Sequence, residues 1–157
     1  MSSKRVRNLV LAAVAVFALI QLVPVPRANP PVTGDIPAPN DVKAALRRAC
    51  YDCHSNETTW PWYSRVAPIS WLVARHVHEG REHLNFSTWD QVSSREKIER
   101  WKHTWEEVNE GEMAPWYYIP AHREAQLTDT EKRRIRIWAL GSANEESYRP
   151  SQPAPAP

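Results

Sequence analysis

The sequence predicts an all-α protein. Several segments repeat their apolar residues at the i, i+3, i+4 and i+7 spacing of a helix that buries one face. Two of these segments begin with a Ser/Thr-x-x-Glu box, which is typical of a helix N-terminus. No segment alternates apolar and polar residues as a half-buried strand does. We therefore expect a small helical domain without a sheet.

The first helix of this domain is expected to begin at Asn40 or Asp41, because either side chain can cap a helix. Its apolar residues lead directly to Cys50 and are Val42, Ala45, Leu46 and Ala49. A second helix is expected over residues 70–79, with Gly80 as its stop signal. The apolar face of this second helix comprises Ile69, Leu72, Val73 and Val77, and His76 falls on the same face.

Capping boxes predict the two remaining helices. The box Ser93-x-x-Glu96 opens the third helix, which Gly111 ends. The side of the third helix expected to be buried comprises Ile98, Trp101, Trp105 and Val108. The box Thr128-x-x-Glu131 opens the last helix. The residues that the last helix is expected to bury before Gly141 are Ile135, Trp138 and Ala139.

The two ends of the chain differ from its middle. Three basic residues, Lys4, Arg5 and Arg7, precede an apolar run, so residues 1–23 resemble a signal anchor or signal peptide. We favour an uncleaved membrane anchor, because no small-x-small cleavage site follows the run. Residues 24–40 contain six prolines and are expected to form an extended tether. The folded domain then covers residues 41–143, and residues 144–157 form a disordered polar tail.

The composition limits the classes of function that are possible. A net charge of +2 is too small to indicate nucleic-acid binding. The basic flank of the N-terminal run predicts that the rest of the chain is exported. Eight tryptophans in a small domain suggest a core built around a flat aromatic ligand, although tryptophan packing alone would give the same composition.

The run Cys50-Tyr51-Asp52-Cys53-His54 contains the only two cysteines of the chain and predicts one covalently attached c-type haem. Two intervening residues let both thiols reach the two vinyl groups on one edge of a porphyrin. The adjacent His54 is then positioned as the proximal axial ligand of the iron. A thioredoxin-type redox pair would require a βαβ context, and a zinc site would require further ligands at metal spacing. Neither is present, so haem attachment is the favoured interpretation.

Met113 is the favoured sixth ligand of the iron. It is the only methionine besides the initiator, and it follows the third helix in a loop with Gly111 and Pro115. A thioether ligand raises the reduction potential, which suits electron transfer. The alternatives are an ordinary core methionine, a histidine ligand, of which His76 is the strongest candidate, or an open position. His122 could bind a haem propionate or a distal ligand, and the remaining histidines are expected to face solvent.

The segment that follows the motif is dense in aromatic residues and proline. Aromatic rings can stack on a porphyrin, and arginines can pair with its propionates. The further candidates for the haem pocket are therefore Trp60, Trp62, Tyr63, Arg65, Trp71, Arg81 and Tyr118. Each aromatic could equally be an ordinary core residue.

Together these motifs resemble the bacterial haem-binding domain family, a group of small c-type cytochrome-like proteins. The resemblance rests on Cys50-x-x-Cys53-His54-Ser55-Asn56, Trp60-Pro61-Trp62-Tyr63, Ala67-Pro68-x-Ser70-Trp71, Gly80-Arg81, Leu84-Asn85-Phe86, Trp89, Met113, Pro115, Tyr118, His122, Leu127 and Trp138. In the family pattern a proline often follows the methionine at once, whereas here Ala114 intervenes. The resemblance implies haem binding outside the cytoplasm.

We therefore expect a membrane-tethered mono-haem cytochrome on the periplasmic side of the bacterial inner membrane, or in the periplasm if the signal is cleaved. It would carry single electrons between unidentified redox partners without an enzymatic reaction of its own. A haem-based sensor or peroxidase-like protein with an exchangeable sixth ligand is the main alternative. A structural subunit of a larger redox complex is a third.

Overall fold

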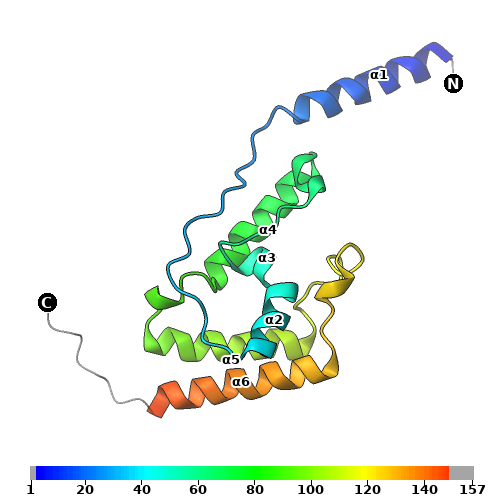
Figure 1. Ribbon diagram of the computed structural model, residues 1–157. Coiled ribbons are helices and arrows are strands. Elements are labelled where there is room, and N and C mark those ends of the chain that lie inside the picture. Colours follow the sequence, from blue (N-terminus) through cyan, green and yellow to red (C-terminus); the bar gives the residue numbers. More distant parts are fainter. Residues whose placement is uncertain (1–2, 149–157) are drawn as a thin grey trace, which may run out of the picture.

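A computed structural model describes residues 3–148 of the chain, and within this range the structure is helical, with one isolated bridge between Gly34 and Thr88 (Figure 1). The all-α prediction is confirmed. The α-helices in chain order are α1 (Ser3–Ile20), α2 (Asn40–Ala49), α3 (Tyr51–His54), α4 (Ile69–His83), α5 (Ser94–Glu110) and α6 (Asp129–Tyr148). Three short 3-10 helices are η1 (Trp62–Arg65), η2 (Trp89–Gln91) and η3 (Arg123–Ala125).

The helices α5 and α6 lie side by side, and the hydrophobic core forms between them, α2 and the segment before α2 (Figure 1). As expected, α2, α5 and α6 bury their apolar faces. The larger buried side chains of this core are Ile36, Leu46, Tyr51, Phe86, Trp89, Trp101, Ile135 and Trp138. Three of the eight tryptophans, Trp89, Trp101 and Trp138, therefore pack in this core, while Trp62 and Trp116 are exposed.

Both capping boxes are confirmed. In α5, the Ser93 hydroxyl accepts a hydrogen bond from the Glu96 N–H at 3.4 Å, and the Glu96 carboxylate accepts one from the Ser93 N–H at 3.1 Å. Thr128 and Glu131 make the equivalent pair at the start of α6. Gly111 ends α5 in the left-handed region at φ 81°, where glycine lacks the steric penalty of other residues. At the start of α2, Pro39 occupies the capping position, and no side chain caps this end.

Two predicted helix ends are wrong. Helix α4 continues through Gly80 to His83, and α6 continues through Gly141 to Tyr148. Residues 144–148, expected in the polar tail, are therefore helical, while the rest of that tail lies outside the described residues. The expected apolar face of α4 is also only partly correct. Val77 is buried, but Ile69 and Leu72 are 48% and 52% exposed.

The proline-rich segment is not a free tether. It runs along the domain and makes hydrogen bonds to residues far away in the sequence. For example, the N–H groups of Thr33 and Gly34 donate to the Ser87 carbonyl, and Ile36 is only 1% exposed. The segment also accepts, since the Pro31 carbonyl receives a hydrogen bond from the Asn56 amide at 2.8 Å. The folded domain consequently begins well before residue 41.

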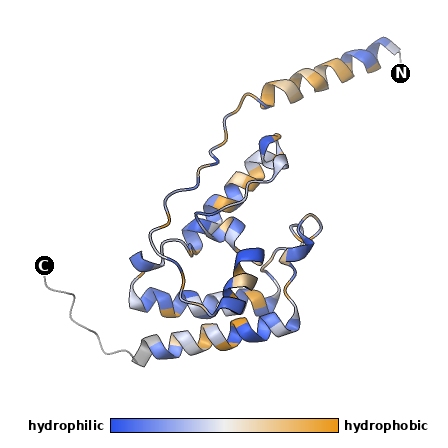
Figure 2. Ribbon diagram, viewed as in Figure 1, coloured by the Kyte–Doolittle hydropathy of each residue, from blue (hydrophilic) through white to orange (hydrophobic). Residues whose placement is uncertain are grey.

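Helix α1 extends away from the domain with no buried residue, and its apolar side chains are exposed (Figures 1 and 2). Within residues 3–148, no helix is both long and apolar enough to span a bilayer.

Candidate functional site

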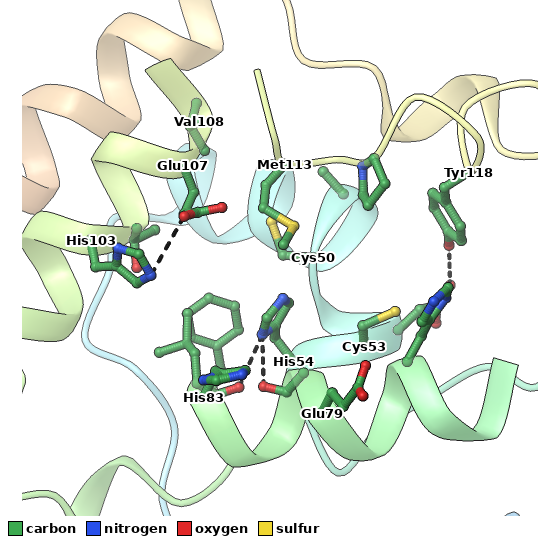
Figure 3. A pocket seen from close by; sticks show the side chains of 18 of the residues that line it. Cys50, Cys53, His54, Glu79, His83, His103, Glu107, Val108, Met113 and Tyr118 are labelled. Carbon is green, nitrogen blue, oxygen red and sulfur yellow. Dashed lines mark hydrogen bonds and ion pairs between the residues drawn. The ribbon is translucent and has the colours of Figure 1, made fainter. Parts of the chain in front are cut away.

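A cavity of about 450 Å³ lies where α3, α4, α5 and the loop after α5 meet (Figure 3). Its walls combine sulfur, imidazole, carboxylate and aromatic side chains. The lining residues are Ala49, Cys50, Asp52, Cys53, His54, His76, Glu79, Gly80, His83, Leu84, Phe86, His103, Thr104, Glu107, Val108, Met113, Pro115, Tyr117 and Tyr118.

The short helix α3 brings both cysteines and His54 to this cavity. Its turn is closed by the Cys50 carbonyl, which accepts hydrogen bonds from the N–H groups of Cys53 at 3.1 Å and His54 at 2.9 Å. Both cysteines are free thiols. Burial raises the pKa of Cys50 to about 12 and that of Cys53 to about 11. The two sulfurs therefore remain protonated at neutral pH.

His54 is held through one ring nitrogen. Its Nδ1 lies 2.9 Å from the Gly80 carbonyl and 3.1 Å from the Leu84 carbonyl, so Nδ1 carries the proton that it donates. Burial lowers the pKa of His54, although these two bonds act in the opposite direction. Nε2 makes no hydrogen bond to any residue from 3 to 148. An imidazole oriented through Nδ1 with a free Nε2 is the usual form of a metal-ligating histidine.

Gly80 allows α4 to approach α3 closely. A Cβ at this position would lie 2.6 Å from the Cys53 carbonyl oxygen. Because that contact is shorter than real Cβ atoms tolerate, only glycine fits without a shift of the backbone. Gly80 is therefore a packing residue within α4, and the helix continues beyond it to His83.

Met113 lines the cavity beside Cys50 in Figure 3. Its N–H donates to the Glu107 carbonyl at 3.2 Å, so the C-terminal turn of α5 positions this residue. His76 also lines the cavity, and its ring lies against Tyr117 with the ring centres 5.5 Å apart. Met113 and His76 therefore both line the cavity that contains His54.

His83 and His103 are exposed, as expected, yet they also line the cavity. His103 lies 3.5 Å from the Glu107 carboxylate. The sequence could have indicated that His103 and Glu107 belong to one site, because they are four residues apart on α5 and lie beside the buried face that contains Val108. Phe86 and Tyr117, which were also missed, belong to loops without a periodic signal, whereas the missed residues Glu79 and Thr104 lie in α4 and α5.

A polar cluster adjoins the cavity at the other side of Cys53. The Tyr118 hydroxyl donates to the Asp52 carboxylate at 2.8 Å, and the Tyr118 ring stacks on His122 at 4.0 Å. The His122 Nε2 lies 2.5 Å from the Tyr63 hydroxyl. Burial and the neighbouring Asp52 charge raise the pKa of Tyr118. Tyr63 and His122 line a smaller cavity of about 60 Å³, which shares Asp52, Cys53, His76 and Tyr118 with the main one.

Five predicted pocket residues line neither cavity: Trp60, Trp62, Arg65, Trp71 and Arg81. The structure therefore does not bring these five residues to the cavity that holds Cys50, Cys53 and His54. Arg81 instead donates to the Ser55 and Ala28 carbonyls at 2.8 and 2.9 Å and thereby holds the proline-rich segment. Trp60 donates to Asn29 of that segment at 3.2 Å, and Trp62 is 78% exposed. None of the residues that line the main cavity is a lysine, an arginine or a tryptophan.

These residues fit a haem. Two protonated thiols and an imidazole with a free nitrogen face one cavity, and a thioether sulfur and further imidazoles line it as well. The fold and cavity define a small all-helical protein with a cofactor site.

The model of the haem-binding domain family matches residues 15–140. The chain therefore belongs to the haem-binding domain family, which confirms the resemblance seen in the sequence, and haem is the ligand that this family binds. A search of curated proteins and a search of solved structures each found no match.

Proposed function

We propose that the chain is a mono-haem c-type cytochrome that transfers single electrons. The observation that supports this proposal most directly is that Cys50, Cys53 and His54 meet at one cavity. There, Nδ1 of His54 is fixed by two backbone carbonyls, and Nε2 is free. When bound, the haem supplies an iron that gains and loses one electron. His54 would bind this iron through Nε2.

Cys50 and Cys53 would hold the haem covalently. Each thiol adds across one vinyl group, with the sulfur bonding to one carbon and the hydrogen to the other, so the reaction consumes no oxidant. The raised pKa of both cysteines keeps this hydrogen on sulfur in the unmodified chain. Permanent attachment also suits a cavity with an open polar side, where exposed His83 and His103 border the site.

Met113 would be the second axial ligand, because α5 holds it in the cavity wall and a thioether favours the reduced state of the iron. His76 and His103 in the same cavity favour one alternative. In that alternative the sixth position is exchangeable, and a histidine assists a bound gas or peroxide as donor or acid, as in a sensor or a peroxidase-like protein.

Carbon monoxide distinguishes the two functions. The reduced holoprotein should bind carbon monoxide slowly and incompletely if Met113 occupies the sixth position. Met113→Ala should bind it rapidly and should have a lower midpoint potential, because the thioether is lost. Rapid and complete binding by the unmodified protein, equal to that of Met113→Ala, would support the exchangeable site and reject the electron carrier with a methionine ligand.

We further propose that the protein is exported and held at the periplasmic face of the membrane by α1. The support is the basic start of α1, with Lys4, Arg5 and Arg7, followed by apolar side chains that the domain leaves exposed. The full chain should then stay with membranes on alkaline extraction. Recovery in the soluble fraction would contradict the anchor.

A further inference from the structure

Exposed apolar side chains gather where α1 meets the domain. We call this surface the apolar end, and it consists of Leu22, Val23, Trp62, Ile69, Trp71 and Leu72. The exposed fractions of Leu22, Trp62 and Leu72 are 77%, 78% and 52%. Several large exposed apolar groups in one region indicate a surface that contacts another apolar phase.

Hydrogen bonds hold the C-terminal end of α1 against this surface. The Gln21 amide donates to the Ala67 carbonyl at 3.3 Å and accepts from the Ala67 N–H at 2.9 Å. A few residues further, Arg27 donates to the Ser64 carbonyl at 3.0 Å. Figure 1 accordingly shows the start of α4 close to the end of α1. Because Ala67 lies between η1 and α4, the exposed residues of both elements are adjacent to the end of α1.

The charge distribution indicates what this surface contacts. The chain has 18 acidic residues, yet residues 1–34 and 58–78, which meet at the Gln21–Ala67 contact, contain none. Of the basic residues in these segments, Arg27 and Arg65 lie near this contact, whereas Arg75 pairs with Glu79 at 2.7 Å and Lys4, Arg5 and Arg7 lie at the far end of α1. A surface with exposed tryptophans, aliphatic residues and arginines but without carboxylates matches the interface of a phospholipid bilayer that carries anionic headgroups.

We propose that the apolar end rests in the interface of the bilayer that holds α1. This inference rests on the proposed membrane anchor and goes beyond it, because an anchor alone would leave the domain free to move. The apolar end of the domain thereby adds to the apolar surface that the short run of α1 presents to the bilayer. Tryptophan suits this position, since its ring prefers the boundary between headgroups and acyl chains.

This contact would fix the height of the cofactor cavity above the membrane surface. Helix α4 begins at the apolar end with Ile69 and reaches the cavity at Gly80, whose carbonyl binds His54. At 1.5 Å per residue, this part of α4 is about 16 Å long. The cavity therefore lies within about 16 Å of the plane of the apolar end, in a fixed orientation, and a membrane-embedded redox partner would meet the same face each time.

Lipid photolabelling tests the inference on the full-length holoprotein. The protein is placed in vesicles of phosphatidylcholine and phosphatidylglycerol that contain a phospholipid with a diazirine near its headgroup. After irradiation, digestion and mass spectrometry locate the lipid adducts. We expect adducts on α1 and on the peptide that carries Trp62, Trp71 and Leu72. Ile137, which is 68% exposed and belongs to α6, away from the end of α1 (Figure 1), should carry none.

The outcomes separate this inference from the proposed anchor. Adducts on α1 without adducts on the apolar end would overturn the inference and leave the anchor intact. The absence of adducts from both would overturn the two together. Equal labelling of Trp62 and Ile137 would show nonspecific contact and would also overturn the inference.

A variant at the junction tests what fixes the domain. Gln21→Ala removes both hydrogen bonds to Ala67, so labelling of the apolar end should fall several-fold while labelling of α1 stays constant. Gln91→Ala serves as the matched control, because Gln91 bonds Thr33 away from the apolar end and should leave both signals unchanged. Unchanged labelling of the apolar end in Gln21→Ala would contradict the role of this contact.

Discussion

Gly80 connects His54, the proposed haem ligand, to helix α4. Its carbonyl accepts the hydrogen bond from His54 Nδ1 at 2.9 Å, and its missing side chain leaves room for the Cys53 carbonyl. One residue thereby sets both the orientation of the imidazole and the distance between α3 and α4. A change at this position should affect the stability of the fold and the binding of the iron together.

Gly80→Ala should lower the free energy of unfolding by about 1–3 kcal/mol, because the new methyl group overpacks the contact with Cys53. Gly141→Ala is the matched control in another helix. No atom lies within 4 Å of a Cβ at Gly141, so alanine should raise stability by about 0.5–1 kcal/mol there. Urea denaturation of both variants measures the difference. A neutral Gly80→Ala would contradict the close packing of α3 on α4.

The candidate site could be predicted from the sequence only where its residues are neighbours in the chain. Cys50, Cys53 and His54 lie within one turn, so their shared chemistry is visible without the fold. Arg81 and Trp60 were predicted to line the pocket, but their partners lie in the proline-rich segment. Trp60 bonds Asn29, which is 31 residues away, and Arg81 bonds Ala28, which is 53 residues away. Such partners depend on how that segment docks, which no local pattern reveals.

Helix starts were predictable because capping is a local interaction. At the start of α6, Glu131 accepts hydrogen bonds from Thr128 and also pairs with Arg48 at 2.7 Å. The ends of α4 and α6 were not predictable. Gly80 and Gly141 resemble stop signals, but in both cases the helical backbone continues to a later residue. No atom lies within 4 Å of a Cβ at Gly141, which continues its helix, or at Gly111, which ends one, so the residue type alone does not mark a helix end.

The α6 cap should make stability depend on pH. The hydrogen bonds from Thr128 and then the pairing with Arg48 lower the pKa of Glu131 from 4.5 to about 2. Since the folded pKa lies below the unfolded one, the carboxylate stabilises the fold above pH 4.5, and this contribution is lost as the pH falls from 4.5 toward 2.

Glu131→Gln should therefore reduce stability at neutral pH and flatten its decline across this acid range. Urea denaturation at a series of pH values checks this expectation. Glu96→Gln is the control, because Glu96 occupies the same position in the α5 box but accepts hydrogen bonds only from Ser93 within residues 3–148. Glu96→Gln should flatten the acid decline of stability less than Glu131→Gln does. Equal pH dependence of the two variants would argue against the contribution of Arg48.

The docked proline-rich segment changes the architecture of the protein. A flexible tether would let the domain move freely, whereas the observed segment joins α1 to the core through Ile36 and a series of hydrogen bonds. Composition alone could not predict this docking, because a single buried isoleucine among six prolines gives no periodic pattern. The fold and the proposed contact with the membrane both depend on this connection.

Ile36→Ala tests the docking directly. Ile36 is 1% exposed in the core, so its truncation should lower the free energy of unfolding by about 2–5 kcal/mol. Val32 lies in the same segment but is 50% exposed, and Val32→Ala should change stability by less than about 0.5 kcal/mol. If both variants leave the free energy of unfolding nearly unchanged in chemical denaturation, the proline-rich segment is a free tether instead.

Covalent haem attachment is tested by the intact mass of the protein, purified after expression with a haem-maturation system and measured under denaturing conditions. The unmodified chain should carry the mass of one haem and retain it after denaturation. Cys50→Ser combined with Cys53→Ser should lose this mass completely, because no thiol remains to form a thioether. A haem mass that survives in the double variant, or that is absent from the unmodified chain, would contradict attachment at Cys50 and Cys53.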